Sequence, residues 1–466
     1  RMLHFIEITL YVLLSGILIL KATQRPIWGT GYYMLNFFAQ PDYWAWGAPL
    51  TNPGVLRWSL YSSLYLLFVT LLQPSATRFK SDPDSKRASG FFVAMLINAL
   101  FVHIAFAYVP EKSWEMWTLM GKYAVFYFLA LATIRSARDF TWFLGFFALG
   151  LAYWGFEGKF VGVTLISGRL EKFGGPGCSN SNELASITAT LLPLMGALII
   201  MVRGIRRVIV AFGTALALNI LMLANSRGGF VGLLVGAVTI PVVSTGRVRE
   251  LALKGMALGA LGAFLLAGNP EILTRFLSTF YSDSSARGQS ALDEANKETR
   301  KVFWKAGLNM LADNPLGSGG AAFKSGKGNP YIAKQGLNDE NRSCHQGFIV
   351  EAMSWGVQGL ILRMGLVICA GLAALKTSRF RMELGDYNTA FAGACICGSF
   401  ATVLVTSLFG DFLQMEWAIW ICIVAVGYAK IFGKANYGKI PDAIFVPEEK
   451  KSDTSAPPSR PVPVGV

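Results

Sequence analysis

One histidine and three arginines stand out because each lies in or beside a polar segment between long apolar stretches. His345 begins an apolar run directly after the polar segment Gly268–Cys344, while Arg169, Arg227 and Arg300 precede or separate other apolar or helical runs. Histidine suits a general base near neutral pH, because its ordinary pKa is about 6.5. Guanidinium groups can bind phosphate oxygens through bidentate hydrogen bonds. Together, a histidine and several arginines suit a reaction that needs a base beside a bound anion.

The chain has 3 histidines, and their surroundings in the sequence differ. His4 lies near the first residue, and His103 lies inside an apolar run, where a satisfied packing role is expected. His345 follows a segment with many basic residues, and this placement favours chemistry. An interfacial histidine without a catalytic role is the alternative for His345.

The arginines also have structural alternatives. Arg300 shares a predicted helix face with Trp304, along which it could reach water instead of binding an anion. Arg227 lies in a tight turn between two apolar runs, where a charge is costly without a partner. That partner could be a ligand, a helix end or Asp411, which could itself help to bind an acceptor. Weaker candidates for the same anion site are Arg275, Arg287 and Lys324.

The sequence gives little support for a metal or another cofactor. The pair Asp82 and Asp84 resembles a metal-binding D-x-D motif, but it lies in a basic connector on the side opposite His345. We found no phosphate-binding glycine loop, no H-E-x-x-H and no serine-nucleophile elbow. We therefore expect no metal and no cofactor at the site.

The composition is that of a membrane protein. Of the 466 residues, 53% are hydrophobic and 15% are charged, whereas soluble proteins carry about 25% charged residues. The apolar runs suit helices of about 20 residues that cross a bilayer. The net charge of +14 lies mainly in short connectors, which favours a cytoplasmic side over a nucleic-acid partner. The sequence thus predicts an all-α polytopic membrane protein.

If the chain crosses the membrane twelve times, its connectors lie alternately on the two sides, and those on one side carry most of the basic residues. The spans are expected to begin near Phe5, Leu50, Gly90, Met116, Phe140, Ala185, Val208, Gly229, Leu251, Gln346, Asn388 and Met415. This division places both termini on the basic, cytoplasmic side and His345 on the opposite side. The aromatic-rich segment Lys21–Pro49 is then expected in the outer interface.

Four parts follow from these spans: a helical scaffold (1–267), a large external loop that contains helices (268–345), three further spans (346–432) and a disordered cytoplasmic tail (433–466). We hypothesise that the loop is the catalytic part of a membrane glycosyltransferase. Cys178 and Cys344 both fall on the external side and could form a disulfide, although nothing further in the sequence supports one.

Several of these residues resemble a known family, the O-antigen ligases, in a superfamily shared with O-antigen polymerases and protein O-oligosaccharyltransferases. The resemblance rests on Arg169, Ser226–Gly228, Arg300 with Trp304, Asn314–Gly319 and His345 with Gly347 and Phe348, followed by Glu351, Gly356 and Gly359. One departure is Gln346, where the superfamily usually has asparagine.

The resemblance implies a GT-C-like enzyme in the bacterial inner membrane with a periplasmic active site. Such an enzyme moves O-antigen polysaccharide from undecaprenyl pyrophosphate to lipid A-core. It implies His345 as the general base, arginines on the pyrophosphate, inversion without metal, and lateral substrate entry from the surrounding membrane lipids.

Three other functions stay open from the sequence. An O-antigen polymerase or a protein O-oligosaccharyltransferase of the same superfamily would use the same donor chemistry with another acceptor. A flippase or transporter of lipid-linked glycans is the alternative from a different class. Transporters often show internal repeats and broken helices near the membrane midplane, and we see no repeat in this sequence.

Overall fold

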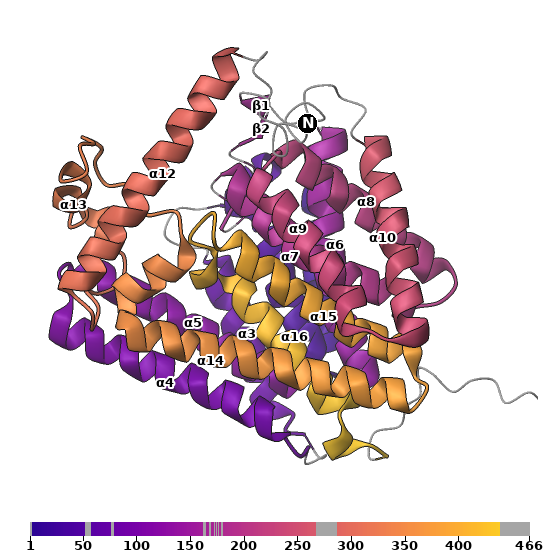
Figure 1. Ribbon diagram of the computed structural model, residues 1–466. Helices are drawn as coiled ribbons and strands as arrows, with labels where there is room; N and C mark the ends of the chain where they lie inside the picture. The colour runs from indigo at the N-terminus through magenta and orange to yellow at the C-terminus, as the bar shows by residue number, and fades with distance from the viewer. Residues whose placement is uncertain are drawn as a thin grey trace, which may run out of the picture.

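The computed structural model describes residues 2–51, 57–75, 79–161, 165–166, 169–171, 173, 175, 177–178, 180–266 and 287–438. This part of the chain is mostly helical, which agrees with the expected all-α class (Figure 1). Two short strands, β1 (Leu165–Ile166) and β2 (Arg169–Leu170), pair antiparallel.

Six helices within the described ranges are long and apolar enough to cross a membrane. They are α1 (Met2–Ala22), α4 (Pro83–Phe106), α7 (Ser181–Met201), α8 (Ile205–Ala224), α14 (Gly347–Glu383) and α15 (Tyr387–Thr406). This confirms a multi-pass membrane protein, while the number of twelve spans stays a prediction. The other long helices are α2 (Ile27–Phe38), α3 (Trp58–Leu72), α5 (Pro110–Thr133), α6 (Ala137–Phe156), α9 (Arg227–Val243), α10 (Gly246–Leu266), α12 (Arg287–Asp313) and α16 (Glu416–Phe432).

Short helical turns connect these helices: η1 (Pro41–Tyr43), η2 (Ala45–Leu50), η3 (Glu157–Val161), η4 (Phe323–Ser325), α13 (Asn329–Ala333), η5 (Phe412–Gln414) and η6 (Lys434–Asn436). Side-chain caps fix several helix starts, as expected for Asp, Ser and Asn before a helix. Asp82 caps α4, Ser136 caps α6 and Asn180 caps α7.

Helix α16 occupies the middle of the bundle. All of its residues from Trp417 to Phe432 are buried except Lys430, and its rings contact Phe37, Phe140 and Phe147 of the surrounding helices. A helix that is apolar on all sides must be enclosed by other apolar elements. The largest core therefore surrounds α16.

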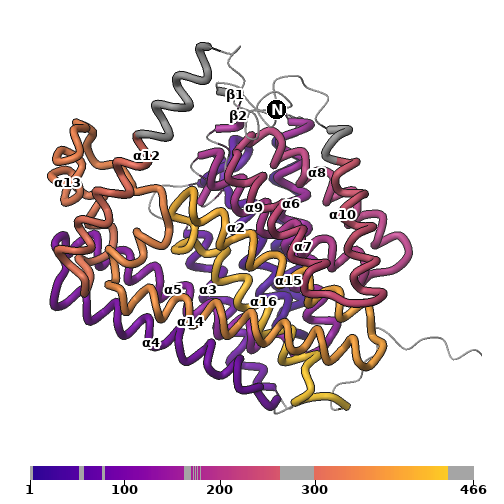
Figure 2. The backbone as a smooth tube through the Cα atoms, viewed as in Figure 1, coloured from indigo at the N-terminus to yellow at the C-terminus, as the bar shows by residue number. Residues whose placement is uncertain are grey.

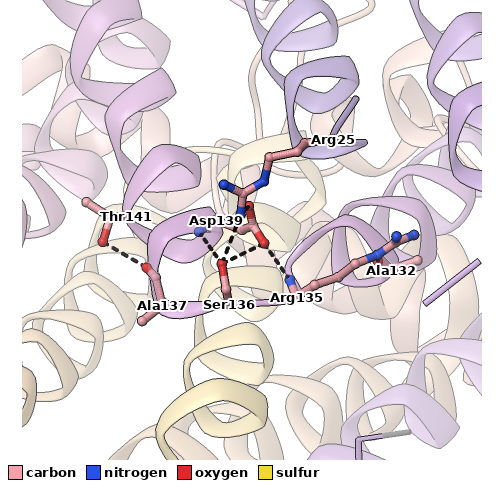
Figure 3. Close-up of polar contacts among 7 residues, drawn as sticks. All are labelled: Arg25, Ala132, Arg135, Ser136, Ala137, Asp139 and Thr141. Carbon is pink, nitrogen blue, oxygen red and sulfur yellow. Dashed lines mark hydrogen bonds and ion pairs between the residues drawn. The ribbon is translucent and has the colours of Figure 1, made fainter. Parts of the chain in front are cut away.

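The ends of the helices define two faces. On one face, which we call the basic face, Arg25 lies 2.7 Å from Asp139 of α6, and Ser136 also donates to that carboxylate (Figure 3). Lys376 at the far part of α14 and Lys430 of α16 lie on the same face, through contacts with Asp84 and Leu131. The opposite face carries His345 and is called the His345 face.

The prediction that both chain ends lie on one side is wrong for the described residues. The N-terminal end of α1 lies beside the β hairpin, on the His345 face (Figure 1), whereas Asn436 bonds to Lys80 on the basic face. Helix α2 causes the difference, because it returns from the basic face and ends where Trp154 of α6 donates to Phe38.

Helix α2 also corrects the expected interfacial placement of Lys21–Pro49. Most of its 12 residues are buried, including Ile27, Tyr32 and Phe38. Twelve residues rise only about 18 Å, which is shorter than a bilayer of about 30 Å. The segment was too short to be predicted as a crossing, and it is buried because its neighbours on both sides are apolar helices.

Helices α12 and α13 lie beside the bundle (Figure 2), and their side chains form a small second core. Phe303 and Met310 of α12 pack with Phe323, Ile332 and Cys344. This satellite core holds α12 against the first turns of α14. At the other end of the chain, Asn436 of η6 is buried.

Candidate functional site

His345 lies at the mouth of α14 in an uncommon backbone conformation. Its φ of 53° is in the left-handed region, which few non-glycine residues adopt. The next residue, Gln346, caps the helix by accepting from the amide of Ile349 at 2.6 Å. The His345 ring lies 6.4 Å from the ring of Phe303, in α12. The backbone therefore turns the imidazole out of the helix, toward α12.

Asp411 lies beside His345, although 66 positions separate them in sequence. Ser343 donates to Asp411 Oδ2, and the His345 amide donates to Ser343 Oγ at 3.4 Å. The amide of Gly347 donates to Ser407 at 2.7 Å and brings the two segments together. Asp411 Oδ1 is buried and has no hydrogen-bond partner among the described residues. The structure thus brings together two of the predicted site residues.

The surroundings favour a neutral imidazole. Loss of water contact lowers the pKa of His345 below its ordinary value, whereas the Asp411 carboxylate raises it; Arg300 and Arg342 lower this pKa, and Glu183 raises it. The net effect lowers the pKa of His345, which favours the unprotonated imidazole that can accept a proton.

This balance predicts the pH dependence of an Asp411→Asn variant. The carboxylate raises the pKa of His345, so its removal should lower that pKa further. A base works only when deprotonated, and activity is therefore lost as pH falls through its pKa. We expect the acid limb of the kcat/KM profile to move to lower pH in Asp411→Asn. An acid limb that stays in place or moves to higher pH would contradict the assignment of Asp411 as the carboxylate beside His345.

A second group of site residues meets where α7 and α9 begin. Asn182 Oδ1 accepts from Arg169 Nη2 at 2.8 Å and from Ser226 Oγ at 2.8 Å. Ser226 precedes α9, whose first residue is Arg227. Asn225, with φ of 45°, ends α8 and turns the chain directly into α9. Arg169 and Arg227 are therefore brought to one junction by Asn182 and Ser226.

This junction continues to the His345 segment through close packing. A Cβ on Gly228 would lie 2.9 Å from Phe409, so only glycine allows this approach. Ser186 of α7 bonds to Thr406 at 3.0 Å. Phe409 and Thr406 precede Asp411 in the chain, and Glu183 of α7 is close enough to shift the pKa of His345. The starts of α7, α9 and α14 thus surround one region of the His345 face.

Arg169 makes more protein contacts than the sequence suggested. Besides Asn182, its guanidinium lies 3.7 Å from the Glu171 carboxylate and donates to the Ala224 carbonyl at 3.4 Å. Glu171 in turn accepts from the amide and hydroxyl of Ser181. These contacts hold the β2 segment on the α7–α9 junction, so Arg169 has a structural role whatever else it binds.

The remaining basic candidates differ in position. Arg300 is exposed on α12 within electrostatic range of His345. Arg287 begins α12, thirteen positions earlier, which is about 20 Å along a helix. Lys324 is exposed in η4, and no contact of the described chain links it to His345. Arg275 lies outside the described residues.

Three residues near the site were not singled out from the sequence. Glu183, Ser343 and Glu171 contact or influence the predicted residues, but nothing in their local pattern marks them. Asn180 caps α7, whereas Asn182 links Arg169 to Ser226. Only the fold places these side chains together.

The cysteines are unpaired, and Cys178 and Cys344 are both buried as free thiols. The described residues contain no group of three or more His, Cys, Asp or Glu side chains arranged to hold a metal. His103 was expected to be satisfied by packing, but its Nδ1 is buried without a hydrogen-bond partner among the described side chains and backbone.

A cavity of about 670 Å³ lies where the end of α4 meets the turn after α12. His103, Ile104, Tyr108, Asn314 and Leu316 are among its lining residues. Ile104 and Leu316 are 75% and 50% exposed, and Ile104 belongs to a helix suited to cross a membrane. The cavity therefore borders an apolar outer surface near the His345 face, but it is not lined by the predicted site residues.

The apolar bundle and the polar cluster at one face define a multi-pass membrane protein with a candidate active site at its helix ends. Residues 212–364 match the sequence model of the family described as O-antigen ligase. The match includes Arg227, Arg300 and His345, and it supports the resemblance: over these residues the chain is similar to the O-antigen ligase family. Comparison with curated proteins gives no match.

Proposed function

We propose that this protein transfers O-antigen polysaccharide from undecaprenyl pyrophosphate to lipid A-core at the periplasmic side of the bacterial inner membrane. The family match supports the reaction class. The single observation that carries the proposal is the close packing of several helix starts on one face. Asn182 of α7 joins Arg169 to Ser226, which precedes Arg227, and Ser186 of α7 bonds to Thr406. Ser343 joins Asp411 to the His345 segment. A candidate base and cationic groups therefore lie at helix starts on one face of the bundle.

In this proposal His345 removes the proton from the acceptor sugar hydroxyl. The hydroxyl oxygen then attacks the anomeric carbon of the donor, and the bond from that carbon to the pyrophosphate oxygen breaks with its electron pair. Undecaprenyl pyrophosphate leaves, and the anomeric configuration inverts. Asp411 Oδ1, which is buried without a partner in the described chain, stabilises the imidazolium that forms.

The arginines stabilise the charge that develops on the leaving pyrophosphate. Arg227 and Arg300 supply donors and charge, and Arg169 adds its charge while its contacts hold the junction. Preorganised donors of this kind are often the largest contribution to a rate. They place positive charge on the phosphates directly, so we expect the reaction to need no metal ion.

Both substrates carry lipids, so each should enter from the bilayer. The cavity beside Ile104 and Leu316 supports lateral entry, because its rim is apolar and exposed. The basic face is proposed to be cytoplasmic, since basic connectors favour that side. With this orientation the C-terminal end of α16 is cytoplasmic and the start of α1 is periplasmic.

The acceptor distinguishes the ligase from the alternatives within the superfamily. Purified protein would be given one undecaprenyl-pyrophosphate glycan together with lipid A-core, an undecaprenyl-linked glycan or an acceptor protein in separate reactions. We expect the glycan to appear only on lipid A-core. Lengthening of the undecaprenyl-linked glycan would identify a polymerase, and glycosylated protein would identify an oligosaccharyltransferase. Movement of intact donor across vesicle membranes without transfer would favour a flippase.

A further inference from the structure

Helix α14 is broken at Gly356. The break separates the half that begins just after His345 from the half that reaches the basic face. Gly356 has φ of 79° and ψ of 169°, which no helix contains. Figure 1 shows the short first part of α14 bent away from the long second part. The break removes the normal helical partners of several carbonyl groups.

The turn after α12 donates hydrogen bonds to carbonyl groups that the break in α14 leaves without helical partners. Ser318 donates from its amide and from its hydroxyl to the Met353 carbonyl, at 2.9 Å each. Gly319 donates to Ser354 at 3.1 Å, and Asn98 of α4 donates to Trp355 at 2.8 Å. The carbonyls freed by the break are therefore bonded, and α12 is attached to the first half of α14.

A buried ion pair crosses the break. Arg363 Nε lies 3.0 Å from Glu351 Oε1, and the side chains are 4% and 0% exposed. In a straight helix these residues would be about 18 Å apart along the axis, too far for contact. The pair can form only because the bend at Gly356 brings the two halves of α14 toward one another.

The same carboxylate also contacts the segment that holds Asp411. Glu351 Oε2 accepts from Gln414 Nε2 at 2.9 Å, and Gln414 ends the turn η5 that follows Asp411. Ser343 joins this segment to His345. Glu351 forms a second link between the first half of α14 and the turn that contains Asp411. Arg363 joins Glu351 to the second half of the helix.

Stability alone does not account for such a pair. Replacing a buried ion pair by apolar residues of similar volume is often neutral or stabilising, because the charges no longer lose their hydration. We propose that Glu351 and Arg363 are positioning residues that set His345 relative to Asp411 across the break in α14. The proposal rests on the proposed function, in which His345 is the base.

The test compares the double variant Glu351→Met/Arg363→Met with the parent in purified, full-length protein. Both charges are replaced together, so no unpaired charge remains and folding should be retained. We expect kcat to fall about 10- to 100-fold, because small displacements of catalytic groups have effects of that size. KM for donor and acceptor should stay within about twofold of the parent, since this pair does not touch substrate.

A second readout does not depend on activity. The rate at which diethyl pyrocarbonate modifies His345, followed by peptide mass across pH, reports the pKa of the imidazole. If the Asp411 turn moves away, the midpoint should shift to lower pH, because that carboxylate raises the pKa of His345. This measurement would still test the positioning role if the acceptor proved to be other than lipid A-core.

A matched control and a milder variant complete the design. Arg381→Met/Asp386→Asn disrupts a partly buried ion pair at the other end of α14, on the basic face, and should leave kcat and the midpoint unchanged. Gln414→Met removes only the link to the Asp411 turn, and it should show a smaller change of the same kind even if the double variant fails to fold. Parent-like kcat and an unshifted midpoint in Gln414→Met or in the folded double variant would overturn the proposal.

Discussion

Replacing Arg227 by alanine is expected to lower the rate of glycan transfer by about 10²- to 10³-fold, the usual effect of losing one preorganised donor to a developing negative charge. The expectation follows from the position of Arg227 at the first turn of α9, joined to Arg169 through Ser226 and Asn182. A helix start also favours an anion by its dipole. The main loss should appear in kcat, because the charge on the leaving pyrophosphate grows in the transition state.

The informative comparison is Arg227→Lys, which keeps the positive charge but loses the two-pronged geometry. It should retain about tenfold more activity than Arg227→Ala, measured as transfer to lipid A-core at saturating donor. Arg247 lies over the ring of Tyr387 at the start of α15, on the basic face. Arg247→Ala is therefore the matched control and should behave as the parent does. Equal rates for the alanine and lysine variants would argue against phosphate binding at this position.

The sequence predicted the class of protein, and it placed His345 and Asp411 on one side of the membrane, for physical reasons. Apolar runs of bilayer length require helices, and isolated polar residues at their ends are costly unless they have partners. His345 and Asp411 are far apart in the chain, but both occur at helix ends on one face, so the span pattern already placed them on the same side. The structure adds the contact through Ser343.

Other features could not be read from the sequence. Helix α2 is too short to register as a crossing, and its burial depends on α3 and α6, which follow later in the chain. The break at Gly356 could not be distinguished from an ordinary glycine in an apolar helix. The ion pair between Glu351 and Arg363 needs that bend. It could therefore not be predicted from a pattern that assumes straight helices.

The arginines show a further limit of sequence analysis. Arg169 was expected to bind phosphate, yet three of its nitrogens contact Glu171, Asn182 and Ala224. An arginine in a glycine-rich loop gives no sign of whether a carboxylate lies beside it. Arg287 and Arg300 illustrate the same point, because only the length of α12 shows how far apart they lie.

His345→Ala should cause the largest loss of activity, about 10²- to 10⁴-fold in kcat, which is the usual contribution of a general base. Loss of water contact, with Arg300 and Arg342, lowers the pKa of the imidazole more than Asp411 and Glu183 raise it, which favours the unprotonated form. Donor binding should change little, since the phosphate contacts are assigned to other residues. His4→Ala is the matched control, because His4 lies neither at this site nor among the residues that line the cavity.

The most direct measurement is a single-turnover reaction with purified protein, undecaprenyl-pyrophosphate glycan and lipid A-core in the presence of a metal chelator. We predict that the parent and His4→Ala form the ligated product at equal rates, while His345→Ala forms it at least about 10²-fold more slowly. Parent-like ligation by His345→Ala, or a parent that stops when chelator is added and resumes with metal, would contradict a base-assisted transfer driven by guanidinium groups.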